Sequence, residues 1–149
     1  MSNEAIKPIK KVYLVFGPES SGNRMIACSF DTAGVSSVYS KNGKYIPGPH
    51  NPNYLDNPLL ILMSLPHNKI WPDIIDIYRK VKSIGFEFIY LIFLDRKTDF
   101  MAKSQVFQDR VTQIERAYEN IQIARDYMKS AIESLDITNL CLLIILFMD

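Results

Sequence analysis

The sequence has little excess charge of either sign and few cysteines. Its 17 Lys and Arg residues against 16 Asp and Glu residues leave a formal net charge of +1. Such a small excess gives no broad basic field, so we expect no nucleic-acid partner and at most a local basic pocket for an anion. Cys28 and Cys141 have no zinc-ligand spacing and make no disulfide framework, so we predict no metal site and a reducing compartment.

We expect neither a signal peptide nor a membrane-spanning segment. The N-terminal stretch MSNEAIKPIKK has no apolar core. The longest apolar run, Leu140–Met148, is well below the roughly 20 residues that a membrane-spanning helix needs, and a buried strand is the simpler interpretation. We therefore expect a cytoplasmic protein with no membrane span. The 149 residues, 48% of them hydrophobic, suit one domain over 1–149.

Apolar runs without alternation are typical of strands buried on both faces of a parallel sheet. Four such runs occur, at Val12–Phe16, Leu59–Ser64, Phe86–Leu94 and Leu140–Phe147. Helical patterns lie between most of them. They predict an α/β fold, a P-loop-like three-layer sandwich with a mainly parallel central sheet flanked by helices.

Three stretches carry the helical patterns. Met25–Phe30 opens the first helix, and Pro72–Ile84 forms the second, with Pro72 in its first turn and Gly85 ending it. The third helix is expected over Val111–Leu135. Its apolar stripe predicts a core face, interrupted only by Arg125, and consists of Val111, Ile114, Tyr118, Ile121, Met128, Ile132 and Leu135.

A long segment rich in Gly, Pro and Asn, Gly34–Pro58, shows no periodicity. Loops of this length in compact domains are usually functional or disordered. Two interpretations of the neighbouring aromatic residues stay open, an acceptor site or simple packing. The residues are Tyr39, Tyr45, Tyr54 and Trp71.

The stretch KVYLVFGPESSGNRMIA has the glycine spacing of a phosphate-binding loop, which reads G-x-x-x-x-G-K-S/T. Asn23 and Arg24 stand where the lysine and the hydroxyl residue would be. Backbone N–H groups and the N-terminus of the following helix still favour an oxyanion. The side chains of Ser20, Ser21 and Asn23 can donate to it, and Arg24 can pair with it. An ordinary strand-to-helix turn is the alternative.

Another polar stretch follows the run at Phe86–Leu94. Arg96 leaves that strand, and Ser104 lies eight residues later. If Thr98 or Asp99 caps a helix, Arg96 and Ser104 can reach the same phosphate. A solvated charged turn would also explain this pattern.

Together, PESSGNR and RKTDFMAKS resemble motifs of the sulfotransferases that use 3′-phosphoadenosine 5′-phosphosulfate (PAPS). That family has a loop such as PKSGTT or RSSGT after its first strand, and R-D/N-x-x-D-x-x-x-S at a later strand end. The resemblance implies that Ser20, Ser21, Gly22, Asn23 and Arg24 bind the 5′-phosphosulfate. It also implies that Arg96 and Ser104 hold the 3′-phosphate. No Walker lysine is needed, because this family binds no magnesium-coordinated γ-phosphate.

The resemblance extends to a catalytic base, since the family often places a histidine after an intermediate strand, in contexts such as THLP. Here LLILMSLPHNKIWPD places His67 after the second strand, where it would deprotonate a hydroxyl acceptor, either a small molecule or a glycan. A histidine that only closes the turn is the alternative. His50 is a poorer candidate.

The sequence departs from the family in two places. Ser20 replaces a basic residue of the 5′ loop, for which Arg24 or Lys69 could substitute. The family's further helices and basic segment have no counterpart after Leu135, so we expect the usual C-terminal part to be lacking and an acceptor pocket that a homo-oligomer could complete. The alternatives are a non-catalytic nucleotide-binding or assembly module and a P-loop nucleotide kinase relative, the latter disfavoured by Asn23.

Overall fold

The computed structural model describes residues 7–35, 54–67, 69–135 and 140–147, with no account of the side chains at 140, 143 and 147. Within these residues the strands form one sheet of order β2-β1-β3-β4, and all neighbouring pairs are parallel. The strands are β1 (Lys11–Pro18), β2 (Leu59–Leu65), β3 (Phe88–Arg96) and β4 (Leu140–Phe147). The predicted α/β fold with a parallel sheet is confirmed.

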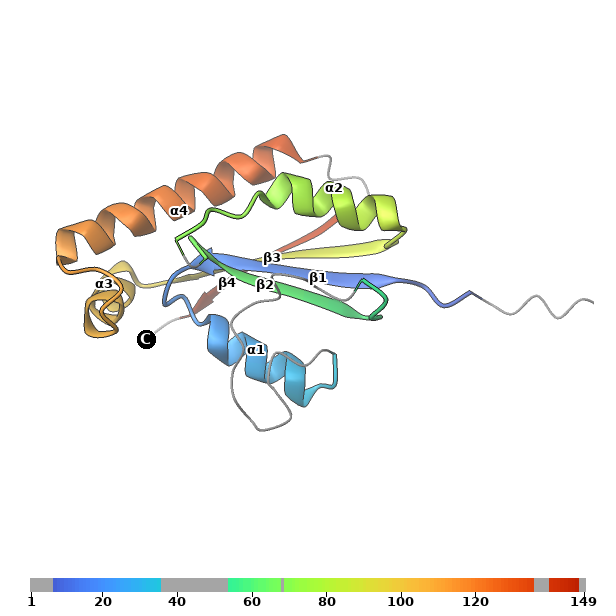
Figure 1. Cartoon of the computed structure of the whole chain (residues 1–149), viewed down its shortest axis with the longest axis horizontal. Helices are drawn as coiled ribbons and strands as arrows, with labels where there is room; N and C mark the ends of the chain where they lie inside the picture. Colours follow the sequence, from blue (N-terminus) through green and yellow to red (C-terminus); the bar gives the residue numbers. More distant parts are fainter. Residues whose placement is uncertain (1–6, 36–53, 68, 136–139, 148–149) are drawn as a thin grey trace, which may run out of the picture.

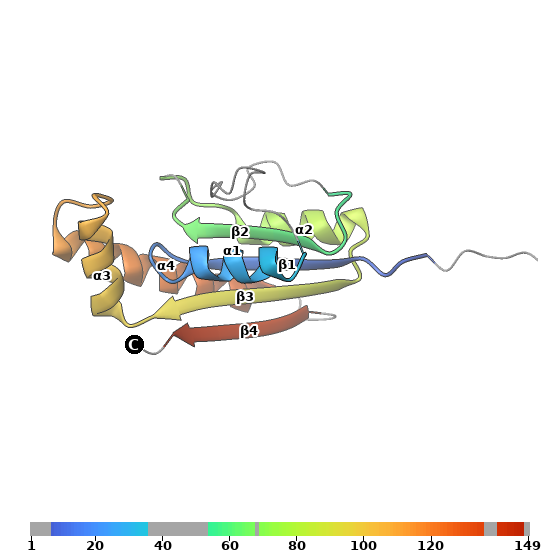
Figure 2. The same cartoon turned by 90° about the horizontal axis from the view of Figure 1, so that it is seen from below.

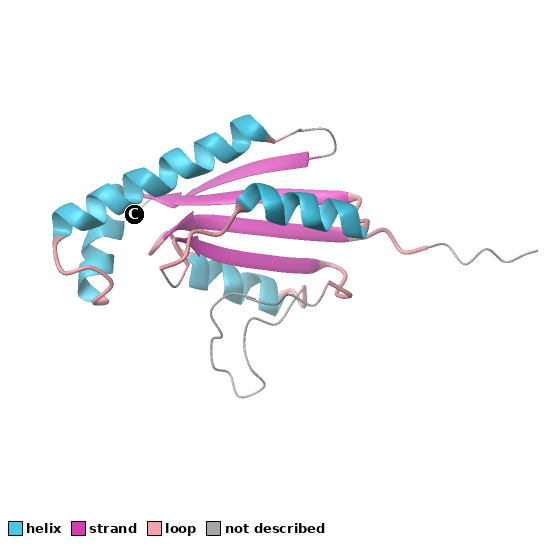
Figure 3. Ribbon diagram, turned by 45° about the horizontal axis from the view of Figure 1, so that its top comes forward, coloured by secondary structure: helices cyan, strands magenta, loops and turns pink. Residues whose placement is uncertain are grey.

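The helices are α1 (Asn23–Thr32), α2 (Ile74–Ile84), α3 (Thr98–Phe107) and α4 (Ile114–Ser134). They complete a three-layer sandwich in which α2 and α4 cover one face of the sheet and α1 covers the other (Figures 1 and 3). Alternate residues of β1 therefore enter different cores. Leu14 and Phe16 pack on the side of α2 and α4, whereas Val15 packs on the side of α1. Because both faces are covered, the strand reads as continuously apolar.

All four strands point toward the same end of the molecule, and α3 lies at that end (Figure 2). The segments that follow β1, β2 and β3 consequently meet there. In open α/β sheets this edge, outside the carboxyl ends of the strands, is where ligands bind. The topology brings the three predicted polar stretches together.

The last apolar run was predicted to be a buried strand. It does form a strand, but the prediction of burial is wrong. Strand β4 pairs only with β3 and lies at the edge of the sheet. Its side chains at Leu142, Ile144 and Leu146 are 38%, 55% and 64% exposed. The physical reason is that α4 packs against β1, nearer the middle of the sheet.

Helix boundaries follow the capping residues more closely than the apolar pattern. Helix α2 begins at Ile74 rather than Pro72, because Asp73 is its N-cap and accepts a hydrogen bond from the Asp76 backbone N–H at 2.9 Å. It ends, as predicted, at Gly85, whose φ of 95° is in the left-handed region. Strand β3 begins at Phe88, two residues later than predicted.

Helix α4 starts at Ile114, and its buried face differs from the predicted stripe. Tyr118 is 37% exposed, so its place in the predicted core face is wrong. The buried residues of α4 are Ala117, Ile121, Ala124, Met128 and Ala131. Alanines allow the helix to approach closely, and a pattern search for large apolar residues misses them.

Most of the long segment Gly34–Pro58 lies outside the described residues, including Tyr39, Tyr45 and His50. Of the other two aromatic residues, Tyr54 packs against the core and Trp71 contacts the Tyr127 ring edge-on at 5.3 Å. Both therefore make packing contacts. In the described part of the chain, none of the helices has the length and apolarity to cross a membrane.

Candidate functional site

The turn after β1 is held close to the sheet. The Ser21 backbone N–H donates to the Pro18 carbonyl at 3.1 Å, and Ser20 and Gly22 have φ values of 69° and 107°. At the start of this turn, a Cβ on Gly17 would meet Ser21 Oγ and lie 2.8 Å from the Leu94 carbonyl oxygen. Gly17 therefore permits a close approach of the turn to β3, and Gly22 permits the left-handed backbone that leads into α1.

The N-terminus of α1 is open to an anion. Gly22 is its N-cap, so no side chain caps the helix, and its first turn contains no acidic residue. The first N–H groups of a helix have no intrahelical acceptors, and the helix dipole makes this end positive. By contrast, α2 has Asp73 as a cap and Asp76 in its first turn.

A cavity of about 850 Å³ lies at the carboxyl ends of β1, β2 and β3. Its lining includes every predicted site residue except Ser21: Ser20, Gly22, Asn23, Arg24, His67, Arg96 and Ser104. Ser21 is fully buried beneath the turn, where its Oγ lies over Gly17. The structure thus brings the two halves of the predicted anion site and the predicted base into one cavity.

Three buried polar side-chain atoms of the turn lack a hydrogen-bond partner within the described part of the chain; one, Ser21 Oγ, lies beneath the turn, and the other two belong to residues of the lining. Ser20 Oγ and Asn23 Oδ1 are buried and accept or donate no hydrogen bond within the described part of the chain. Both residues line the cavity. Buried polar groups are normally hydrogen-bonded, and a bound ion or water is one explanation for those that are not. A rotation of the Asn23 amide would present its NH2 group to an anion.

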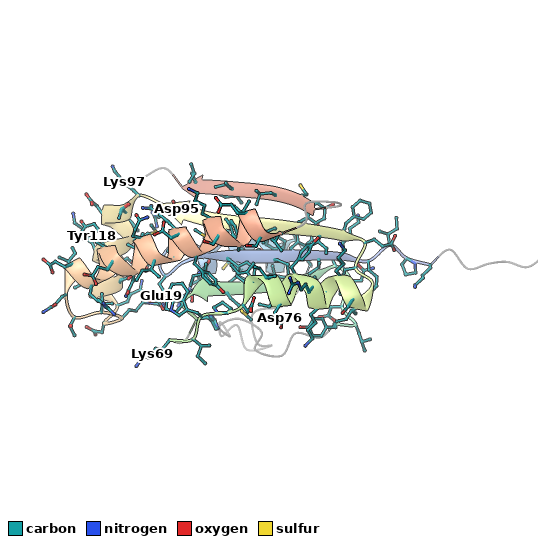
Figure 4. All side chains as sticks on the ribbon, turned by 90° about the horizontal axis from the view of Figure 1, so that it is seen from above. Glu19, Lys69, Asp76, Asp95, Lys97 and Tyr118 are labelled. Carbon is teal, nitrogen blue, oxygen red and sulfur yellow. The ribbon has the colours of Figure 1, made fainter. Side chains whose placement is uncertain are left out.

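Glu19, the acidic residue of the turn, is neutralised locally. Its Oε1 atom lies 3.0 Å from Arg110 NH1, and its side chain is only 16% exposed. The Glu19 carbonyl accepts a hydrogen bond from Gln105 Nε2 on α3 at 2.9 Å. Figure 4 shows Glu19 and Lys69 in the same region, with Lys69 pointing outward. Lys69 is exposed and does not line the cavity, whereas Arg24 does.

The opposite wall of the cavity carries Arg96 and Ser104. The guanidinium carbon of Arg96 lies 3.5 Å from the ring centroid of Phe100, so the aromatic face holds the arginine in place. The N-cap of α3 is Lys97, without a side-chain cap, so the expectation of Thr98 or Asp99 as the cap is wrong. Thr98 Oγ1 instead accepts from Arg125 NH1 at 2.7 Å. Ser104, further along α3 (Thr98–Phe107), still lines the cavity.

Asp99 forms a hydrogen bond with a residue of α4 and does not cap α3. Its Oδ1 atom accepts a hydrogen bond from the Tyr118 hydroxyl at 2.9 Å. This hydrogen bond, with smaller contributions from burial and from nearby carboxylates, raises the pKa of Tyr118 above its ordinary value. The contact links the first turn of α3 to α4, outside the cavity.

His67 is buried, with 8% of its surface exposed. Its backbone exchanges two hydrogen bonds with Ile70, at 2.8 and 3.0 Å, which hold the turn after β2. Its Nδ1 atom lies 3.3 Å from Ser64 Oγ and 3.4 Å from the Ser64 nitrogen. These two contacts imply opposite tautomers, since the hydroxyl would accept from Nδ1–H and the backbone N–H would donate to a bare Nδ1.

The Ser64 hydroxyl has a second partner that bears on the tautomer. It donates its hydrogen to the Pro66 carbonyl at 2.8 Å, so it offers only lone pairs to the histidine. That arrangement suits hydrogen on Nδ1, whereas the Ser64 backbone N–H, whose direction is fixed, suits a bare Nδ1. With hydrogen on Nδ1, Nε2 would carry the lone pair that a general base requires.

Sequence reasoning missed several residues of the lining: Ser64, Cys28, Gln108 and Arg110. Gln108 lies four residues after Ser104, so it faces the same side of α3, and this spacing was the available signal. Arg110 follows the end of α3, where no periodicity identifies it. Its position depends on the way the helix terminates.

Comparisons of the chain with protein-family models, with curated proteins and with solved structures found no match. Among the described residues, no group of three or more His, Cys, Asp or Glu side chains could hold a metal ion. The site is therefore interpreted from its own geometry.

Proposed function

We propose that this protein binds PAPS and transfers its sulfuryl group to a hydroxyl acceptor. One observation carries the proposal. A single cavity is lined by Ser20 and Arg24 after β1, by His67 after β2, and by Arg96 and Ser104 after β3. These are the groups that the sulfotransferase resemblance assigns to the 5′-phosphosulfate, the base and the 3′-phosphate.

The residues present fit a nucleotide with two anionic ends. The cavity, at about 850 Å³, is within the 300–1,000 Å³ range of ligand pockets. Three arginines, Arg24, Arg96 and Arg110, line it, and Glu19 is the one carboxylate in the described lining. With three arginines and one carboxylate, the described lining has a net positive charge, which favours a polyanion.

On the 5′ side, the open N-terminus of α1 and the Ser20 hydroxyl would hold a phosphate oxygen. The helix end supplies backbone N–H groups and a positive dipole. Arg24 lies in the first turn of α1 and would contribute a two-point contact. This set of donors explains how the loop would bind an anion without a Walker lysine.

On the 3′ side, Arg96 and Ser104 would share one phosphate. Stacking on Phe100 limits the motion of the Arg96 guanidinium, which lowers the entropic cost of binding. Because a hydrogen bond to a charged group contributes about 1.5–3 kcal/mol, removing Arg96 should weaken the complex at least tenfold.

PAPS would supply the activated sulfuryl group. The chain would orient the acceptor hydroxyl and take its proton at His67 Nε2. Ser64 would hold Nδ1–H and thereby stabilise the tautomer that accepts the proton. Burial of His67 limits access of water to the base.

Calorimetric titration with 3′,5′-adenosine bisphosphate, with AMP and ADP alongside, tests the binding step. We expect the bisphosphate to bind at least tenfold more tightly than AMP, and Arg96→Ala to remove most of this difference. Arg116→Ala is the matched control, because Arg116 pairs with Glu119 on the exposed side of α4. Equal affinity for the bisphosphate and AMP would contradict the proposal, as would magnesium-dependent preference for ADP.

Turnover is tested by release of 3′,5′-adenosine bisphosphate from PAPS in the presence of a panel of phenolic, alcoholic and glycan acceptors. His67→Asn should abolish acceptor-dependent release while leaving bisphosphate affinity within about twofold of wild type, because His67 is proposed to contact the acceptor. Loss of binding and turnover together would instead assign His67 a structural role in the turn after β2.

One observation favours a second candidate, nucleotide binding without turnover. Ser20 stands where the resemblance would place a basic residue, and Lys69 is exposed and is not part of the cavity lining. Arg24 is then the cation left for charge on the leaving oxygen. In this case bisphosphate binding would depend on the 3′-phosphate, and no acceptor would release product from PAPS.

A further inference from the structure

A chain of side-chain hydrogen bonds joins the turn after β1 to the last turn of α3. Arg110 NH1 donates to Glu19 Oε1 at 3.0 Å, and Arg110 Nε donates to Gln108 Oε1 at 3.0 Å. Gln108 Nε2 in turn donates to Ser104 Oγ at 2.9 Å. All four residues line the cavity described above. We call this chain the Arg110 relay.

The end of α3 aims Arg110 back toward the cavity. The Asp109 N–H donates to the Val106 carbonyl and the Arg110 N–H to the Gln105 carbonyl, both at 3.0 Å. Asp109 has a φ of 54°, in the left-handed region. This pattern is a Schellman motif, which reverses the chain after the helix. The backbone of Arg110 is thus fixed, and its side chain extends from a defined point toward Glu19.

The hydrogen bonds of the relay can run in only one direction from donor to acceptor. A guanidinium has donors and no acceptor, so the atom of Gln108 that faces Arg110 Nε must be the amide oxygen. The amide NH2 group then faces Ser104 and donates to its hydroxyl oxygen. With that lone pair occupied, the Ser104 hydroxyl hydrogen is directed away from Gln108 and can be donated to a ligand in the cavity that Ser104 lines.

We infer that Arg110, acting through Gln108, is a positioning residue that holds the Ser104 hydroxyl as a donor to a phosphate bound in the cavity. The inference rests on the proposed nucleotide site. It adds two residues to the 3′ side that the sulfotransferase resemblance does not include. It also couples both sides of the site, because the same Arg110 neutralises Glu19 in the 5′ turn.

A direct contact of Gln108 with the bound phosphate is the competing explanation, because Gln108 itself lines the cavity. A double-mutant cycle between Gln108 and Ser104 separates the two. If Gln108 acts through Ser104, its removal has no further effect once the hydroxyl is gone. If it contacts the ligand directly, its effect is the same with and without the hydroxyl.

The experiment measures the affinities of Gln108→Met, Ser104→Ala and the double variant for 3′,5′-adenosine bisphosphate and for AMP by calorimetry. We expect Gln108→Met to lower the preference for the bisphosphate about fivefold, and less than twofold in the Ser104→Ala background. Equal factors in the two backgrounds would overturn the inference. The ratio of the two affinities is insensitive to a general loss of folded protein, which weakens both ligands alike.

Arg110→Lys is a second, independent variant. Lysine keeps the charge beside Glu19 but cannot donate to Glu19 and Gln108 in the fixed geometry of a guanidinium. We expect it to reduce the preference for the bisphosphate as much as Gln108→Met does, and an unchanged preference would count against the relay. Gln122→Met is the matched control, since Gln122 pairs with Asp126 on the exposed face of α4 at 3.0 Å.

Failure of the inference is distinguishable from failure of the proposed function. If the wild-type protein binds the bisphosphate no better than AMP, it has no 3′-phosphate site, and both the proposed function and the inference are wrong. Wild-type protein that prefers the bisphosphate, combined with additive effects in the cycle, would overturn the relay alone.

Discussion

Arg125 on α4 and Asp95 at the end of β3 form a two-point ion pair. The distances are 2.9 Å from Nε to Oδ2 and 2.9 Å from NH2 to Oδ1. The same guanidinium donates to Thr98 Oγ1 at 2.7 Å and to the Arg96 carbonyl at 3.0 Å. One side chain thus fixes the turn between β3 and α3, from which Arg96 enters the cavity. This explains why an arginine interrupts the apolar pattern of α4.

Replacing Arg125 with methionine should lower the free energy of unfolding by about 2 kcal/mol. The two side chains are 27% and 21% exposed, so the effect lies between that of a surface ion pair and that of a buried one. Urea denaturation followed by circular dichroism measures it. Arg116→Met, which breaks an exposed pair, should cost less than about 0.5 kcal/mol. Similar losses for both variants would show that the Arg125 contacts add nothing beyond surface charge.

Replacing Gly17 with alanine should both destabilise the protein and weaken anion binding. The added Cβ would collide with Ser21 Oγ and lie 2.8 Å from the Leu94 carbonyl, so the turn must shift away from β3. Overpacking of this kind costs about 1–3 kcal/mol. Thermal unfolding and bisphosphate titration measure the two effects.

Gly34→Ala is the control for that variant. Gly34 has a φ of 71°, and a Cβ there would meet no atom of the described residues within 4 Å, so alanine introduces backbone strain without a collision with them. We expect it to lower stability by about 1 kcal/mol and to leave bisphosphate affinity unchanged. If both variants lose bisphosphate affinity equally, the loss in Gly17→Ala does not come from displacement of the turn, and the prediction is wrong.

Phe100→Leu should loosen Arg96 without unfolding the helix. The Arg96 guanidinium carbon lies 3.5 Å from the centre of the Phe100 ring, and Phe100 is 43% exposed. A cation–π contact at such a site contributes about 0.5–1 kcal/mol. The expected result is a loss of about threefold in bisphosphate affinity, with AMP affinity unchanged. Phe107→Leu, at a 90% exposed position of the same helix, should change neither affinity.

Ionisation of the Tyr127 hydroxyl should lower the stability of the protein at alkaline pH. Burial raises the pKa of its hydroxyl above the ordinary value of 10.0, and the charge of Asp73 adds to the effect. The folded state then keeps its proton at pH values where the unfolded chain loses it. The contribution of Tyr127 to the free energy of unfolding is therefore fully present below about pH 10. It decreases as the pH rises from there toward the folded-state pKa.

The test is the free energy of unfolding of wild type and Tyr127→Phe between pH 8 and pH 11. The variant should lose about 1 kcal/mol at pH 8, because the hydroxyl donates to the Pro72 carbonyl at 2.7 Å. Its decrease at high pH should be shallower than that of wild type. Parallel curves would mean that another group accounts for the alkaline loss of stability.

Local patterns were sufficient to predict the fold class and seven of the fourteen residues that line the cavity. Continuous apolar runs such as Val12–Phe16 and Leu59–Ser64 predict strands covered on both faces, and parallel strands bring their carboxyl ends to one edge. Arg96 and Ser104 were therefore predicted to lie near Ser20 and Arg24, and the cavity lining includes all four. Their roles toward PAPS remain predictions.

Only the tertiary structure decided which strand lies at the edge and which residues support the site. The apolar sequence of β4 does not reveal whether a helix covers this strand. In the structure α4 packs against β1, which leaves Ile144 of β4 55% exposed. The contacts of Arg125 with Asp95 and of Arg110 with Glu19 join residues that are distant in sequence. No local period encodes such pairs, because they depend on the relative positions of whole elements.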